Sequence, residues 1–374
     1  MVVAVAVLLA AVFAVGAAKG AARLTTHPVV WGLAGWIVPG DLGVFFGAGD
    51  AVLAGESPYP TGELAPPPAA YYVYPPPLAL AIAPLAALPP PEASAIWTVL
   101  GIGAVIGALL VLGVRDWRCH VLALLFPGTL EALEYGAIGT FLALLIALAW
   151  RYRAQLPLTA AATAGAVVLK LFLWPLLVWH LLAGRPRTAV AACAGAAGLA
   201  LASWAVLGFA GLTDYPRLLR DLTELEAEHT YSLFALARAL DVPELPAQAV
   251  GIVVGLALLA LAARAGDDRR TLILVLGAAF ALTPILWHHY LVLLVVPVAL
   301  VRPRLSALWL LPLVGNVFDA LGWYGGWTYG EVHSIVSVLG LTGVVLAASV
   351  AAAGRPQPVA ASAAVPVSVR SSSR

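Results

Sequence analysis

The strongest constraint on this chain is a series of long apolar runs that contain almost no charged residues. Of its 374 residues, 62% are hydrophobic and only 10% are charged, whereas a soluble chain has about 25% charged residues. A helix needs about 20 apolar residues to cross a bilayer. The sequence therefore predicts an all-α polytopic membrane protein. The clearest runs are Val2–Ala18, Ala93–Val114, Ala189–Phe209, Ala247–Ala263, Thr271–Leu282, Tyr290–Val301, Leu305–Phe318 and Val332–Ala353.

The apolar sequence between Val121 and Leu182 has room for four more short crossings, which brings the expected number of spans to about ten to twelve. The whole of 1–354 is expected to form one transmembrane domain, with 19–91 as its first extracytoplasmic loop. Residues 355–374 are rich in Ala, Ser, Pro and Val and are expected to form a disordered cytoplasmic tail. The run Val2–Ala18 lacks a basic segment before it and is long for a signal peptide, so a retained helix is favoured over a cleaved one.

Arginine placement predicts the orientation, because loops rich in Lys and Arg stay in the cytoplasm. The acidic loops at 131–134, 214–228 and 319–331 then face outward. Lys19 and Arg23 after the first run disagree with this alternation, but the later basic loops are mutually consistent. The sequence thus favours a multi-pass protein of the plasma membrane. The basic loops contain Arg115 and Arg118, Arg151 and Arg153, Arg185 and Arg187, Arg264 with Arg269 and Arg270, Arg302 and Arg304, and Arg355.

Composition and motifs exclude several classes of function. The net charge is +1 and no basic tract is present, which argues against nucleic-acid binding. Cys119 and Cys193 lie far apart and form neither a disulfide framework nor a CxxC pair. The chain has no Walker A loop, GxGxxG after a strand, HExxH or GxSxG motif. No cofactor is therefore expected.

The first loop contains two segments with a predicted structure. Asp41 to Gly55 includes Phe45, Phe46, Val52 and Leu53, a pattern that indicates an interfacial helix. Leu78–Leu88 is either a short or re-entrant helix or the start of one long kinked helix that ends at Val114. In the second long outer loop, Asp214–Glu228 is charged and amphipathic.

Asp41 is the first candidate for chemistry, because it begins the predicted interfacial helix, where the helix dipole favours a carboxylate. A simple N-cap is the alternative. Asp50 lies nine positions further on and half a turn out of phase, so the two carboxylates do not share a helical face and are not expected to bind a metal together.

Lys170 lies in an apolar segment that continues to Pro175. A lysine at the centre of a membrane helix costs roughly 2.5–3.5 kcal/mol unless it reaches the interface or meets an anion. Lys170 is therefore expected either to bind an anionic lipid or phosphate, or to snorkel at the tip of a hairpin.

His288 and His289 follow Trp287 at the outer end of a span. Adjacent residues of a helix point about 100° apart, so the pair is not expected to bind one metal ion. One imidazole could donate to a phosphate or a hydroxyl; an interfacial polar belt with Trp287 and Tyr290 is the alternative. The aromatic cluster from Trp323 to Tyr329 favours a similar belt or a sugar-stacking surface.

Taken in order, several segments resemble the bacterial polyprenyl-phosphate-mannose-dependent mannosyltransferases of glycosyltransferase family 87, which belong to the multi-spanning GT-C class. Lys170 with Arg185-Pro-Arg187 is similar to the family's Lys-containing helix and basic loop. The segment from Thr283 to Tyr290 is similar to its Ser-Pro…Trp-x-His-Tyr segment, with His289 in the His position. The first outer loop resembles the family through Gly40-Asp41, Phe45-Phe46, Leu53-Ala-Gly55, Pro58-Tyr59, Tyr74-Pro-Pro-Pro77 and Ala83-Pro84-Leu85.

The resemblance implies a GT-C bundle that transfers a mannosyl group from a polyprenyl phosphate to a glycan or glycolipid hydroxyl on the extracytoplasmic side. Asp41 would be the general base, and Lys170 and His289 would bind the donor phosphate. No metal or cofactor is implied, and the partners are the lipid-linked donor, the acceptor and membrane lipids. Further substrate contacts are expected from Tyr59, Tyr74, His229, Trp287 and His288.

Two departures from the family bear on the substrate. Gly136-Ala-Ile-Gly139 stands where the family has a Gly-Gln-x-Asn stretch, and His229 replaces an Asn in a segment similar to the family's Asn-x-Ser-Leu. Two alternatives stay open: a non-catalytic flippase or transporter of lipid-linked sugars, and a related transferase for another sugar such as arabinose or glucose.

Overall fold

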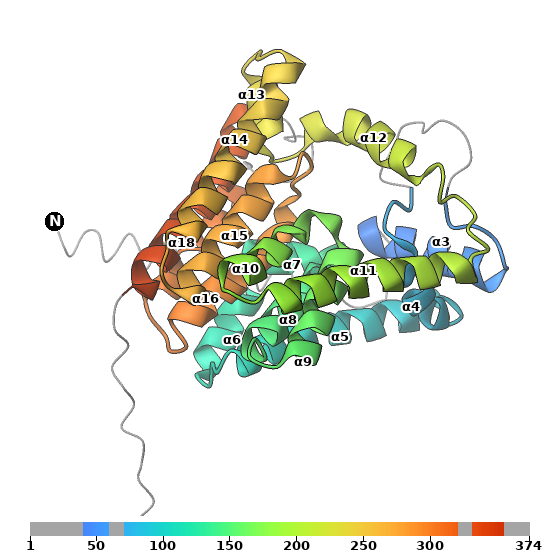
Figure 1. The fold of residues 1–374 in the computed structure, drawn as a ribbon, viewed down its shortest axis with the longest axis horizontal. Coiled ribbons are helices and arrows are strands. Elements are labelled where there is room, and N and C mark those ends of the chain that lie inside the picture. Colours follow the sequence, from blue (N-terminus) through green and yellow to red (C-terminus); the bar gives the residue numbers. More distant parts are fainter. Residues whose placement is uncertain (1–39, 60–70, 321–330, 355–374) are drawn as a thin grey trace, which may run out of the picture.

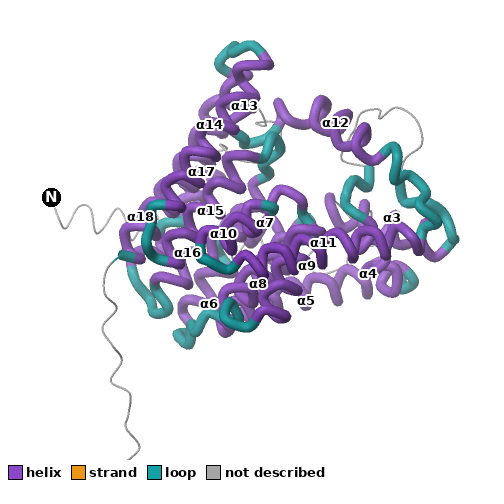
Figure 2. Tube along the Cα trace, viewed as in Figure 1, coloured by secondary structure: helices purple, strands orange, loops and turns teal. Residues whose placement is uncertain are grey.

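The structure is a computed structural model that describes residues 40–59, 71–320 and 331–354. Within these residues the chain is helical and has no strand, as Figures 1 and 2 show. The all-α fold class is thus confirmed. The run Val2–Ala18, the cluster from Trp323 to Tyr329 and the tail 355–374 lie outside the described residues.

The described helices include long and short elements, and several consecutive ones are separated by only a few residues. The α-helices are α3 (Gly40–Leu53), α4 (Pro76–Ala86), α5 (Pro90–Val111), α6 (Trp117–Leu124), α7 (Pro127–Glu134), α8 (Gly139–Arg151), α9 (Leu156–Leu169), α10 (Pro175–Leu182), α11 (Pro186–Val206), α12 (Tyr215–Glu226), α13 (Leu233–Ala239), α14 (Glu244–Ala263), α15 (Asp268–Leu282), α16 (Val295–Val301), α17 (Val314–Ala320) and α18 (Val332–Ala353). The 3₁₀ segments are η2 (Leu171–Leu173), η3 (Ala227–His229), η4 (His288–Leu294) and η5 (Ala307–Leu310).

Four of the described helices are long and apolar enough to cross a membrane: α5, α11, α14 and α18. In α11 and α14 only 22% of the apolar window is buried within the protein. Their exposed faces are apolar, as expected of surfaces that contact lipid. The other apolar helices are shorter, with 10–17 residues.

Prolines begin several helices, because a residue at the first helical position needs no N–H partner and proline already has the required φ. Pro76 begins α4 and Pro90 begins α5, with a break at Ala87–Pro89 between them. The short helix expected at Leu78–Leu88 is therefore the separate helix α4, which ends at Ala86, and the alternative of one long kinked helix is wrong.

Close backbone approach holds the C-terminal helices together. A Cβ on Gly251 of α14 would lie 2.6 Å from the carbonyl oxygen of Ala281 in α15, so only glycine fits there. Small residues allow membrane helices to pack at such short separations. Elsewhere α9 packs against α8 and α11. α12 runs above α11 in Figure 1, and Tyr215 at its start packs edge-to-face on Trp204 of α11 at 5.7 Å.

Candidate functional site

A cavity of about 390 Å³ lies where α3, α7, α12 and two helix breaks meet. Its size is within the range of small-molecule sites. The polar side chains converge in a region whose other walls are apolar, including Leu169, Leu219, Leu222 and Ile285. The polar or aromatic lining residues are Asp41, Tyr71, Tyr74, Glu131, Tyr135, Lys170, Phe172, Tyr215, Glu226, Thr283, Trp287, His289 and Tyr290.

Asp41 reaches this cavity from the first turn of α3, so the predicted helix is confirmed. Its side chain is 26% exposed. The carboxylate accepts a hydrogen bond of 3.1 Å from the Tyr74 hydroxyl, and His289 Nε2 lies 3.7 Å from the same oxygen. Asp50, on the same helix, is exposed and does not line the cavity. The two carboxylates thus face different surroundings, as their spacing predicted.

Lys170 lies at a break between helices, which corrects the expectation of a Lys-containing helix. α9 ends at Leu169, and Lys170 has an extended backbone with φ −148° and ψ 99°. Pro175 begins α10 and has no N–H to continue a helix from the preceding residues. The Lys170 ammonium donates to the Tyr74 hydroxyl at 2.5 Å and lies over the rings of Tyr74 and Tyr290 at 4.1 and 4.6 Å.

A second proline break places the histidines. α15 ends before Thr283, which is extended as expected of a residue that precedes proline, and the chain resumes as η4 at His288. His288 forms a buried hydrogen bond with Glu131 of α7, whereas His289 approaches Asp41. The two imidazoles therefore have different acidic neighbours. Among the described residues, no three His, Cys, Asp or Glu side chains are grouped to hold a metal ion.

One face of α12 lines the cavity. Tyr215, Leu219, Leu222 and Glu226 recur every three or four residues and all line it, which is the spacing of a single helical face. This confirms the amphipathic character predicted for this loop. Burial raises the pKa of Glu226, an effect that the nearby His229 partly offsets.

The other predicted substrate contacts divide into two groups. Tyr74 and Trp287 line the cavity. Tyr59 is buried outside it, stacks on Trp204 at 4.7 Å and donates to the Tyr74 carbonyl at 2.9 Å. His229 is exposed and does not line the cavity, and His288 lies behind it against Glu131.

Glu131 and Glu226 are cavity acids that were not selected from the sequence. Both were assigned only to acidic outer loops, although Glu131 is an ionisable residue within a largely apolar stretch, a signal that often marks a functional site. Nothing in the local sequence indicates that α12 folds back over Asp41, so Glu226 had no such signal.

Two glycines join α3 to the turn after α7, and so position Asp41. Gly40 and Gly136 have φ of +61° and +64°, a conformation that L side chains rarely adopt. A Cβ on Gly40 would collide with the Tyr135 ring, and one on Gly136 would lie 2.5 Å from Leu42 Cβ. The Leu42 N–H donates to the Tyr135 carbonyl at 3.1 Å between them. The close contact needs glycine on both sides.

Gly40→Ala is therefore expected to lower the free energy of unfolding by about 1–3 kcal/mol, through backbone strain and displacement of Tyr135. Thermal unfolding of the purified protein in detergent measures the change. Gly47→Ala is the matched control, since Gly47 lies on the same helix with open space around it. Equal unfolding temperatures for the two variants would contradict the proposed contact.

Comparisons with known proteins add a family assignment. The family model described as Glycosyltransferase family 87 matches residues 72–297, which is more than half of the chain. The match covers every lining element named above except α3. No curated protein and no solved structure matches the chain.

Proposed function

Because the chain belongs to glycosyltransferase family 87, we propose that it transfers a mannosyl group from polyprenyl-phosphate-mannose to a glycan or glycolipid hydroxyl outside the plasma membrane, within a GT-C type bundle. One observation carries the proposal. Asp41 and Lys170, a base and a cation, both bond to the Tyr74 hydroxyl in one cavity.

The donor class is supported by the mixed character of the cavity. Its polar region contains the cation Lys170 beside His289, and apolar side chains from α9 and α12 form other walls. A polyprenyl-phosphate sugar likewise has a charged phosphate end, which would suit the polar region, and a hydrocarbon end, which would suit the apolar walls. A nucleotide-sugar donor is not favoured, since the sequence has no nucleotide-binding motif.

Asp41 is the proposed general base. Its carboxylate takes the proton of the acceptor hydroxyl while that oxygen attacks C1 of the sugar. The new C1–O bond forms as the bond from C1 to the phosphate oxygen breaks, and polyprenyl phosphate leaves with the electron pair. A donor with a β linkage gives an α product, because attack occurs opposite to the leaving group.

Lys170 and His289 are the proposed partners of the donor phosphate. Negative charge grows on the bridging oxygen as the C1–O bond breaks, and a fixed cation in a water-poor site stabilises that charge more strongly than in bulk water. Lys170 contacts one hydroxyl and two aromatic rings, and no carboxylate among the described residues bonds to it directly. Its ammonium can therefore donate to a phosphate.

Membrane vesicles test the proposal. Vesicles from cells with and without the chain are supplied with polyprenyl-phosphate-mannose labelled in the sugar, and the label is followed after mild acid treatment. Mild acid cleaves the sugar phosphate but leaves an O-glycoside intact, so acid-stable label measures transfer. We expect acid-stable label only in vesicles that contain the chain.

Two further arms separate the alternatives. Movement of labelled donor across the bilayer without acid-stable product would contradict the transferase and favour a flippase or transporter. Parallel donors that carry glucose or arabinose test the sugar, and faster transfer of either would overturn the mannosyl assignment while leaving the transferase intact.

A further inference from the structure

An open pocket of about 420 Å³ lies away from the catalytic candidates, at the turn between α8 and α9 and the start of α11. Three arginines line it: Arg153, Arg185 and Arg187, called here the arginine pocket. These residues belong to basic loops, which the distribution of positive charge predicts to be cytoplasmic. None of them lines the cavity that contains Asp41.

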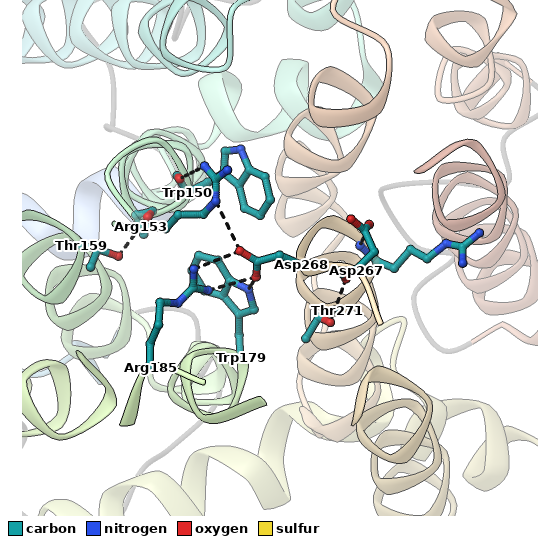
Figure 3. Close-up of polar contacts among 10 residues, drawn as sticks. Trp150, Arg153, Thr159, Trp179, Arg185, Asp267, Asp268 and Thr271 are labelled. Atoms are coloured by element: carbon teal, nitrogen blue, oxygen red, sulfur yellow. Dashed lines mark hydrogen bonds and ion pairs between the residues drawn. The ribbon is translucent and has the colours of Figure 1, made fainter. Parts of the chain in front are cut away.

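The positive charge of the arginine pocket is only partly neutralised. Figure 3 shows the Arg153 and Arg185 side chains converging on Asp268 at the start of α15. Arg185 donates to both carboxylate oxygens of Asp268 at 3.0 Å, and Arg153 Nε lies 3.3 Å from Asp268 Oδ2. The Trp179 indole N–H donates to the same carboxylate at 2.7 Å. One carboxylate thus pairs with two guanidinium groups.

Two donor groups are left for a further anion. Arg187 is exposed and makes no hydrogen bond or ion pair within the part of the chain that the structure describes. Within the same described residues, the buried Nε of Arg185 also has no acceptor. A buried donor of this kind costs free energy unless a ligand or water satisfies it.

Exposed apolar side chains lie in the chain segments that line the arginine pocket and in those next to them. Leu156 lines it and is 42% exposed. Leu158 and Val190, on the adjoining turns of α9 and α11, are 48% and 68% exposed. A free phosphate would not contact such a surface, whereas the acyl chains of a phospholipid would. Basic pockets between membrane helices on the cytoplasmic side are suited to anionic headgroups.

We infer that the arginine pocket binds the phosphate headgroup of an anionic phospholipid in the cytoplasmic leaflet, with the acyl chains along α9 and α11. Guanidinium groups bind phosphate oxygens with two parallel hydrogen bonds, which favours arginine at such sites. This inference does not depend on the proposed transferase activity, since the two sites share no lining residue.

Native mass spectrometry of the full chain in a non-ionic detergent tests the inference. Phosphatidylglycerol is titrated against phosphatidylcholine of the same acyl chains, and glycerol phosphate is titrated as the soluble headgroup. We expect phosphatidylglycerol to bind more tightly than either. Arg187→Gln should weaken phosphatidylglycerol binding about tenfold, because one charge-assisted contact is removed.

Arg264→Gln is the control, since Arg264 lies in another basic loop and its side chain donates to the Ala260 carbonyl of its own helix. Its phosphatidylglycerol affinity should equal that of the unmodified protein. The inference fails if Arg187→Gln and Arg264→Gln bind equally well, or if phosphatidylcholine binds as tightly as phosphatidylglycerol. If glycerol phosphate binds as tightly as phosphatidylglycerol, the pocket binds a soluble anion and the proposal of a lipid ligand is wrong.

Discussion

Asp41→Asn is expected to lower the rate of sugar transfer by about 10²–10⁴-fold, which is the contribution of a positioned general base. The amide keeps the size of the side chain and an oxygen that can accept from the Tyr74 hydroxyl, but it cannot take a proton from the acceptor. The side chain is partly exposed, so the unfolding temperature should hardly change. Transfer in vesicles and thermal unfolding in detergent measure the two quantities.

Asp50→Asn is the matched control, because Asp50 lies on the same helix but outside the cavity. It removes the same charge and should leave transfer unchanged. Near-normal transfer by Asp41→Asn would show that another group is the base, and Glu131 would then be the next acid to replace.

Lys170→Met is expected to reduce transfer by about 10²–10³-fold, comparable to removing one preorganised donor that stabilises developing negative charge. Methionine keeps the length of an unbranched side chain but has no cation for the phosphate. The free energy of unfolding should stay within about 1 kcal/mol, because a desolvated ammonium contributes little net stability and its removal relieves that cost. Donor-dependent rates and thermal unfolding provide the test.

Arg238→Gln is the control for Lys170, since it removes a positive charge that pairs with Glu228 and does not line the cavity. It should leave the donor-dependent rate unchanged. If Lys170→Met loses stability and protein yield in proportion to activity, Lys170 has a structural role and the phosphate assignment is wrong.

Much of the helical framework could be predicted because it depends on local properties. The runs Ala93–Val114, Ala189–Phe209, Ala247–Ala263 and Val332–Ala353 became α5, α11, α14 and α18. An apolar segment of this length has no other way to satisfy its backbone in hydrocarbon. Asp41 and Lys170 were recognisable for a related reason, since charges within or beside apolar segments are costly.

The breaks inside the membrane domain were harder to place. Pro175 and Pro284 were visible in the sequence, but a proline leaves open whether a helix kinks, ends or begins nearby. The structure ends α9 at Leu169 and α15 at Leu282. Lys170 and His289 then approach the same cavity from two different helix breaks, which no spacing along the chain could indicate.

The amino-acid sequence alone determined that the chain is helical and membrane-spanning, and it marked Asp41, Lys170 and His289 as residues for chemistry. Tertiary structure alone decided that Tyr74 bonds to both Asp41 and Lys170, that Glu131 and Glu226 line the same cavity, and that Tyr59 and His229 do not. The physical reason is that helix formation depends on neighbours along the chain. A site depends instead on how helices that are distant in sequence pack together, and that packing is set by the shapes of many side chains at once.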